Sequence, residues 1–141
     1  MIGLAAWAIT VRAQRTRLEE GLARAVQMFN IGYASHIRLA EFTDFEWDLF
    51  YIFPPYTSGD QIVSTLGYDW FGVRFTSIAE SDNVNLLVFM REGRVVRWVE
   101  LPRSTGDFAL LADDSPFTLE AAVFIMVGND GRVFQLLEAP E

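Results

Sequence analysis

The N-terminal part of the chain has the hydrophobic spacing of an α-helix. Between residues 2 and 29 an apolar residue recurs every seven positions, and neighbours widen this line into a stripe: Leu4, Val11, Leu18 and Ala25, with Trp7, Ala8, Leu22, Val26 and Phe29. Such a stripe predicts a long amphipathic helix with one face for burial. Asn30 and Gly32 predict its end, because both residue types tolerate the left-handed backbone at a helix C-terminus.

After residue 43 the period changes to two. Acidic residues alternate with large apolar ones before a continuous apolar run over residues 50–53: Asp44, Glu46 and Asp48 alternate with Phe45, Trp47 and Leu49. The alternation predicts a strand that turns Trp47 towards the core. Pro54 and Pro55 should end this strand, because proline has no backbone donor.

A short helix is expected next. Thr57 and Asp60 have the spacing of a capping box, and Ile62 and Leu66 supply an apolar face. Gly67 then predicts a left-handed C-terminal cap, so the helix should be two turns long.

The rest of the chain predicts strands joined by tight turns. Apolar and β-branched runs lie at 71–79, 84–91, 94–101, 120–128 and 132–138, with breaks at 81–83, 92–93 and 129–131. We therefore expect an α+β fold with the long N-terminal helix, one short helix and an antiparallel β-meander of about five to six strands. The predicted organisation is a helix over residues 1–32 and a single α+β domain over 33–141.

The hairpin around Glu92 and Gly93 can be paired in detail. A two-residue loop there sets these residues opposite one another: Met90 and Val95, Phe89 and Val96, Val88 and Arg97, Leu87 and Trp98, Leu86 and Val99. Both faces of this hairpin are then apolar, so one should pack under a helix and the other against a second layer or a partner. Arg97 stands in an apolar row. We expect its side chain to form an ion pair with a carboxylate or to reach the sheet edge, and an anion site is the alternative.

The residue inventory excludes most common catalytic chemistry. The chain has no cysteine, a single histidine at His36, and only arginines among its eleven basic residues. Thiolate nucleophiles, Schiff-base lysines and multi-histidine metal sites are therefore absent. We expect no cofactor, no metal and no enzymatic activity, and we assign His36 no catalytic role.

Carboxylates are the remaining candidates for chemistry. Asp44, Glu46 and Asp48 match the first ligand spacings of a calcium-binding EF-hand loop, but Leu49 and Pro55 occupy the positions of its glycine and final glutamate. Other polar pairs lie at predicted turns, where the backbone favours them: Asp113 and Asp114, and Asp82 with Asn83 and Asn85. A small carboxylate-dependent enzyme stays an alternative, and it would need a buried acid near Arg97 or Tyr56.

Charge divides the chain into two parts. Residues 1–40 carry five arginines against two glutamates, or +3, whereas residues 41–141 carry six arginines against 17 acids, or −11. An acidic body repels phosphate backbones, so we expect no nucleic-acid partner. Residues 1–11 are uncharged but too short to cross a bilayer. We expect residues 1–17 to contact a membrane surface through Trp7, Arg12, Arg15 and Arg17. The alternatives are that this helix packs on the chain's own domain or on another copy of the chain. A translation start upstream of Met1 is a further alternative.

Residues 45–57, Phe-Glu-Trp-Asp-Leu-Phe-Tyr-Ile-Phe-Pro-Pro-Tyr-Thr, with Ile62 and Leu66-Gly67 after them, form a motif. It resembles a motif of uncharacterised bacterial proteins that are exported or membrane-anchored. The hairpin over 85–96 is similar to small lipoproteins of outer-membrane assembly, although this chain lacks a lipobox cysteine and the paired helices of that family. The resemblance implies a cell-envelope location and a structural or binding role, and it brings no catalytic residues.

These observations predict a non-enzymatic cell-envelope module that is tethered by its N-terminal helix and binds another protein. Large aromatic side chains dominate such interfaces, so the expected binding residues are Tyr51, Tyr56, Trp70 and Trp98, together with Arg97. For each of these four aromatic residues, the competing interpretation is that the side chain is buried in the core. The twelve phenylalanines suggest a carrier of apolar ligands as an alternative function. A cytoplasmic location is the alternative to the envelope.

Overall fold

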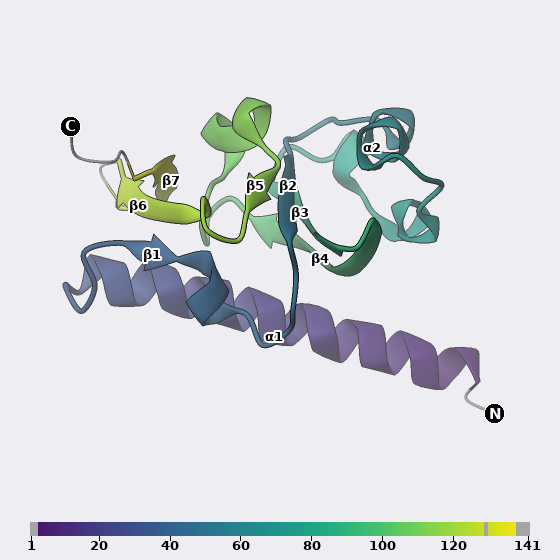
Figure 1. Ribbon diagram of the computed structural model, residues 1–141, viewed down its shortest axis with the longest axis horizontal. Coiled ribbons are helices and arrows are strands. Elements are labelled where there is room, and N and C mark those ends of the chain that lie inside the picture. Colours follow the sequence, from purple (N-terminus) through teal and green to yellow (C-terminus); the bar gives the residue numbers. More distant parts are fainter. Residues whose placement is uncertain (1–2, 129, 138–141) are drawn as a thin grey trace.

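The computed structural model describes residues 3–128 and 130–137 and confirms the α+β fold class (Figure 1). The helices and strands are α1 (Leu4–Asn30), β1 (Ile37–Arg38), β2 (Leu49–Phe53), α2 (Gly59–Leu66), β3 (Val84–Arg91), β4 (Arg94–Pro102), β5 (Phe117–Thr118), β6 (Val123–Val127) and β7 (Val133–Leu136). Short 3-10 helices lie between them: η1 (Leu39–Phe42), η2 (Phe71–Phe75), η3 (Ile78–Glu80) and η4 (Ala109–Asp114).

The strands form two antiparallel sheets where the sequence pattern predicted one meander. One sheet has the order β4-β3-β2-β5 and the other β1-β6-β7. β1 follows α1 directly but pairs with β6, with Ile37 opposite Phe124. The turn predicted at 129–131 includes residue 129, which lies outside the described residues, and Gly131 has φ 66°.

Helix α1 runs beneath both sheets along the long axis of the molecule (Figure 1). Its buried residues all lie in the C-terminal half: Leu18, Gly21, Leu22, Ala25 and Val26. Its first turns are exposed instead, including Leu4 and Ile9. The stripe thus lies on one uninterrupted helix, but only the second half of the stripe enters the core. The predicted start at residue 2 lies outside the described residues.

The four-stranded sheet is buried on both faces, as its hairpin predicted. Leu87 and Phe89 face a core that includes Leu22 of α1, whereas Leu86 and Val88 face a second cluster with Ile62 of α2. The C-terminal half of α1 thus packs on one face of this sheet. The short segments α2, η2 and η3 pack on the opposite face.

The hairpin confirms the predicted turn and corrects most of the predicted pairs. Glu92 and Gly93 have φ 52° and 79°, and Met90 lies opposite Val95 as expected. A bulge between Phe89 and Met90 then shifts the register. The predicted pairs beyond Met90 are wrong for that reason: Phe89 lies opposite Arg97, Val88 opposite Trp98, Leu87 opposite Val99 and Leu86 opposite Glu100.

The capping box of α2 starts one residue later than predicted. Ser58 is the N-cap: its hydroxyl accepts from the Gln61 backbone N–H at 3.2 Å, and the Gln61 side chain accepts from the Ser58 N–H. The Thr57 hydroxyl donates to the Pro54 carbonyl at 2.6 Å instead. Gly67 closes the helix at φ 85°, as expected.

Two predicted strands are shorter or absent. Residues 71–79 form 3-10 turns instead of a strand, and Phe71 and Phe75 remain exposed. The strand expected from residue 43 begins only at Leu49. Trp47 nevertheless points inward and is 5% exposed, which confirms the orientation that the alternation predicted.

Candidate functional site: an aromatic hollow beside the first half of α1

Five of the predicted contact residues meet at one place. Trp7, Arg15, Trp70, Arg97 and Trp98 all line a hollow bounded by α1, η2 and β4. Its apolar part, which we call the aromatic hollow, has a volume of about 360 Å³ and is lined by Trp7, Ala8, Val11, Arg15, Trp70, Phe71, Gly72, Phe75 and Trp98. A second part of about 220 Å³, the polar annex, shares several of these walls and adds Gln14, Val95, Val96 and Arg97.

Aromatic contacts build the walls of the hollow. The Trp70 and Trp98 rings meet edge to face with centroids 5.6 Å apart, and Trp7 lies 5.8 Å from Phe75 across the gap between α1 and η2. Trp70 and Trp98 are 7% and 9% exposed, so most of each ring belongs to the core. The core interpretation thus holds for the bulk of these two rings, and one side of each borders the hollow.

Gly72 determines where the Trp70 ring lies. A Cβ atom at this position would come within 2.3 Å of the ring. Because any side chain would push the indole away, glycine allows Trp70 to fold back against the residues that follow it. The local sequence Trp70-Phe71-Gly72 therefore shapes one wall of the hollow.

Arg15 holds α1 against the sheet edge. Its guanidinium carbon lies 4.6 Å from the centroid of the Trp98 ring, which is a cation–π contact. The Nε atom of Arg15 is buried and has no hydrogen-bond partner among the described residues. A buried donor without an acceptor costs free energy, so this atom marks a place where an acceptor would be stabilising.

Of the expectations for Arg97, the ion pair is not formed within the described residues. Its guanidinium carbon lies 5.0 Å from the centroid of the Phe45 ring, and Nη1 donates to the Val96 carbonyl at 2.7 Å. Of the ion pairs formed within residues 3–128 and 130–137, none includes Arg97 or Arg15. The ring of Phe45 takes the place of the expected carboxylate.

The lining of the hollow is positive although the chain is acidic. Arg15 and Arg97 contribute charge, and no aspartate or glutamate of the described part of the chain lines either compartment. The whole sequence carries a net charge of −8. The lining of the hollow is therefore locally basic on a chain that is acidic as a whole.

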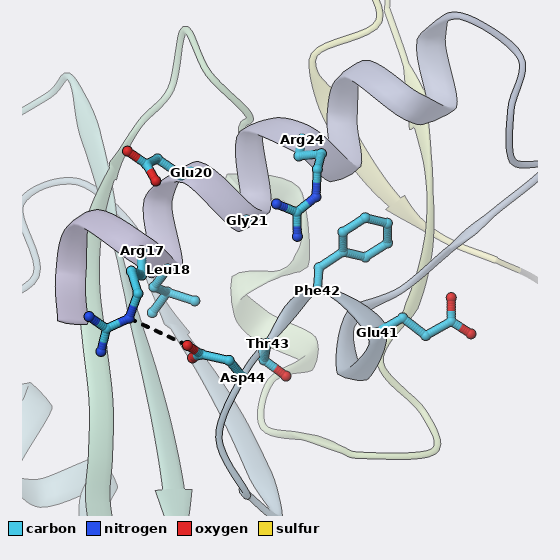
Figure 2. A pocket seen from close by; sticks show the side chains of 9 residues that line it. All are labelled: Arg17, Leu18, Glu20, Gly21, Arg24, Glu41, Phe42, Thr43 and Asp44. Carbon is cyan, nitrogen blue, oxygen red and sulfur yellow. Dashed lines mark ion pairs between the residues drawn. The ribbon is translucent and has the colours of Figure 1, made fainter. Parts of the chain in front are cut away.

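A second hollow lies on another side of α1 and has mixed charge. Figure 2 shows Arg17 and Arg24 projecting from α1 towards residues 41–44, where Arg17 Nε lies 3.4 Å from Asp44 Oδ2. Gly21 permits this close approach, because a Cβ atom there would lie 2.6 Å from the Phe42 carbonyl oxygen. Two arginines and three acids line this hollow, and the contacts explain the surface as packing between α1 and η1. Arg17, predicted to contact a membrane, is paired in this hollow.

The other predicted contact residues lie apart from the aromatic hollow. Tyr51 is half-buried and its ring stacks on that of Phe53, with centroids 6.2 Å apart. Tyr56 is 62% exposed in the loop after β2, where it has φ 67°. Arg12 is exposed on α1. Trp70 and Trp98 thus lie together, whereas Tyr51 and Tyr56 line neither compartment of the hollow.

Two of the candidate acids, Asp48 and Glu46, have structural partners. Asp48 Oδ2 accepts from the Glu92 N–H at 2.9 Å, and Glu46 pairs with Arg91. Asn85 is buried and its Nδ2 donates to Asp107 Oδ1 at 2.9 Å. No cluster of three or more histidine, cysteine, aspartate or glutamate residues able to hold a metal ion occurs within the described ranges.

Sequence reasoning missed Phe71 and Phe75. It assigned them to a strand, and no local pattern links them to Trp7 in α1. The chain matches no protein-family model, no curated protein and no solved structure. The similarity to exported bacterial proteins therefore stays a prediction from residues 45–57.

Proposed function

We propose that this protein is a non-enzymatic binding module of the cell envelope that attaches to an anionic membrane surface by one end. The observation that carries this proposal is a group of exposed apolar side chains, which we call the aromatic end. Its members and exposed fractions are Leu4 86%, Trp7 45%, Phe71 56% and Phe75 52%. Exposed apolar groups of this kind mark interaction surfaces.

Contacts join two distant segments into this surface. Phe75 lies 5.8 Å from Trp7 and 5.5 Å from Phe71, measured between ring centroids. Arg74 lies over the Phe71 ring at 5.0 Å. Aromatic rings beside arginines suit the boundary between acyl chains and headgroups.

Charge supports an anionic surface as the partner. Residues 1–17 carry three arginines and no acid, whereas the whole chain carries −8, so the first half of α1 would face the headgroups while the acidic body is repelled. Each arginine near such a surface contributes about 1 kcal/mol of attraction. None of the helices within the described ranges has the length and apolar character needed to cross a bilayer. The proposed attachment is accordingly peripheral.

The protein partner expected from the sequence remains a separate part of this proposal. Tyr56 is its strongest support, because the ring is exposed beside Pro54 and Pro55. Tyr51 is half-buried and offers less surface.

Vesicle co-sedimentation tests the membrane attachment. The full chain should sediment with vesicles of phosphatidylglycerol and phosphatidylcholine, sediment less at high salt because the charges are screened, and ignore pure phosphatidylcholine. The double variant Phe71→Ser with Phe75→Ser should lose most of this binding. Leu110→Ser is the matched control, because Leu110 is 73% exposed on η4 outside the aromatic end. Equal loss in the control, or no sedimentation of the full chain, would contradict the proposal.

A further inference from the structure

The aromatic hollow has the size and lining of a small-molecule site. Its volume of about 360 Å³ falls within the range of about 300–1,000 Å³ that is typical of ligand pockets. The walls are mostly apolar, with Trp7, Trp70 and Trp98 as the largest groups. An alkyl chain or a similar apolar group would be removed from water there.

The polar annex adjoins this apolar part and has a different chemistry. The two compartments share Trp7, Arg15 and Trp98 as walls, and the annex adds Gln14 and Arg97. Arg15 Nε is buried without an acceptor, and neither arginine forms an ion pair in the described part of the structure. A negatively charged oxygen placed in the annex would accept from these donors.

The geometry points to a single-chain anionic amphiphile as the ligand of this hollow. Its alkyl chain lies among Trp7, Trp70 and Phe75, and its carboxylate or phosphate head lies between Arg15 and Arg97. A neutral apolar molecule leaves the Arg15 donor unsatisfied, and a cationic head meets two positive charges. This site binds a ligand monomer from water and not a bilayer, so it can be tested without vesicles although it shares Trp7, Phe71 and Phe75 with the aromatic end.

Titration with short amphiphiles tests the site in the full chain. Calorimetry and tryptophan fluorescence are recorded with decanoate, decyl phosphate, decan-1-ol and decyltrimethylammonium, each kept below its micelle concentration. We expect saturable binding of at least one anionic probe, tighter than that of decan-1-ol by about tenfold, as for one charge-assisted hydrogen bond. Tighter binding of decanoate indicates free fatty acids, and tighter binding of decyl phosphate indicates phospholipid-derived ligands.

Arginine variants locate the head group. Arg15→Gln and Arg97→Gln should each weaken binding of the anionic probe by about tenfold and leave binding of decan-1-ol within about twofold. Arg94→Gln is the matched control: Arg94 is on the same strand and also lies over an aromatic ring, that of Tyr68 at 5.1 Å, but does not line the hollow. This control should bind both probes as the unaltered chain does.

Three results would overturn the inference. They are the absence of saturable binding by both anionic probes, equal affinity for the anionic, neutral and cationic probes, and equal weakening by Arg94→Gln. If an arginine variant fails to fold, the comparison of the four probes on the unaltered chain still tests whether the hollow prefers anionic amphiphiles. If the unaltered chain binds decanoate but does not sediment with anionic vesicles, the proposed attachment is wrong and the ligand site stands.

Discussion

The guanidinium group of Arg15 lies on the face of the Trp98 ring, with 4.6 Å between the guanidinium carbon and the ring centroid. This contact joins the exposed half of α1 to β4, the edge strand of the four-stranded sheet. Among the described residues, Arg15 is the one charged residue that lines the aromatic hollow, and this contact places it next to the Trp98 ring. The same pair thus joins the helix to the sheet and borders the hollow.

Replacing Arg15 by alanine should destabilise the protein modestly. The variant loses the contact with Trp98, and cation–π contacts contribute about 0.5–2 kcal/mol. The free energy of unfolding, measured in urea, should fall by that amount. Arg12→Ala is the control on the same helix, because Arg12 is exposed, and it should change stability by less than about 0.5 kcal/mol. Equal effects of the two variants would show that the Trp98 contact contributes nothing.

Gly21→Ala should destabilise the protein although alanine favours helices. Helix propensity alone would stabilise this variant by about 1 kcal/mol. The added Cβ would lie 2.6 Å from the Phe42 carbonyl oxygen, which is backbone and cannot rotate away. Overpacking of this kind costs about 1–3 kcal/mol, so the net effect on the free energy of unfolding should be a loss.

Gly59→Ala provides the comparison for Gly21. Gly59 is the first residue of α2, and its Cβ would meet only the Val73 side chain at 3.4 Å. This variant should be as stable as the unaltered chain or slightly more stable. Stabilisation by Gly21→Ala would show that α1 and η1 are not held in close contact.

Trp47→Ala should cost about 3–5 kcal/mol, the usual loss for a large aromatic residue of a core. Trp47 packs edge to face against Phe89 at 5.2 Å, and its Nε1 donates to Thr43 Oγ1 at 3.0 Å. Chemical denaturation should show the loss. Tyr33→Ala is the control, because Tyr33 is 79% exposed. A cost below about 1 kcal/mol for Trp47→Ala would mean that the ring makes no useful contact.

Removing residues 1–17 should leave a folded protein that no longer binds anionic vesicles. The first buried residue of α1 is Leu18, so the deletion spares the helical part of the core, although residues 1–2 lie outside the described structure. The deletion breaks the exposed Arg17–Asp44 pair, which contributes at most about 1 kcal/mol. Circular dichroism and vesicle sedimentation measure the two effects.

A shorter deletion separates the aromatic hollow from the N-terminal tip. Removing residues 1–6 keeps Trp7 and Arg15, so the hollow should still bind decanoate while vesicle binding weakens through the loss of Leu4. If the longer deletion unfolds the chain, the first half of α1 is part of the core and the proposed attachment loses its structural basis.

The sequence by itself determined the elements that local patterns govern. The period of the apolar stripe specifies α1, the alternation around Trp47 specifies which side faces inward, and Gly67 and the Glu92-Gly93 pair adopt positive φ angles where turns require them. Each of these depends on neighbours within a few residues. The residues that meet at the hollow were also selected from the sequence, but for two separate roles. Trp7 and Arg15 were expected to contact a membrane, and Trp70, Trp98 and Arg97 were expected to bind a protein.

Only the tertiary structure decided how these elements meet. Phe71 and Phe75 lie in a 3-10 helix because their segment pairs with no strand, and Trp7 then packs on Phe75. The bulge beside Met90 sets Arg97 opposite Phe89, and no pattern within the hairpin reveals it. The aromatic hollow exists because residues far apart in the chain pack together. Local spacing determines periods and turns, whereas the packing of distant side chains determines register, exposure and the shape of a site.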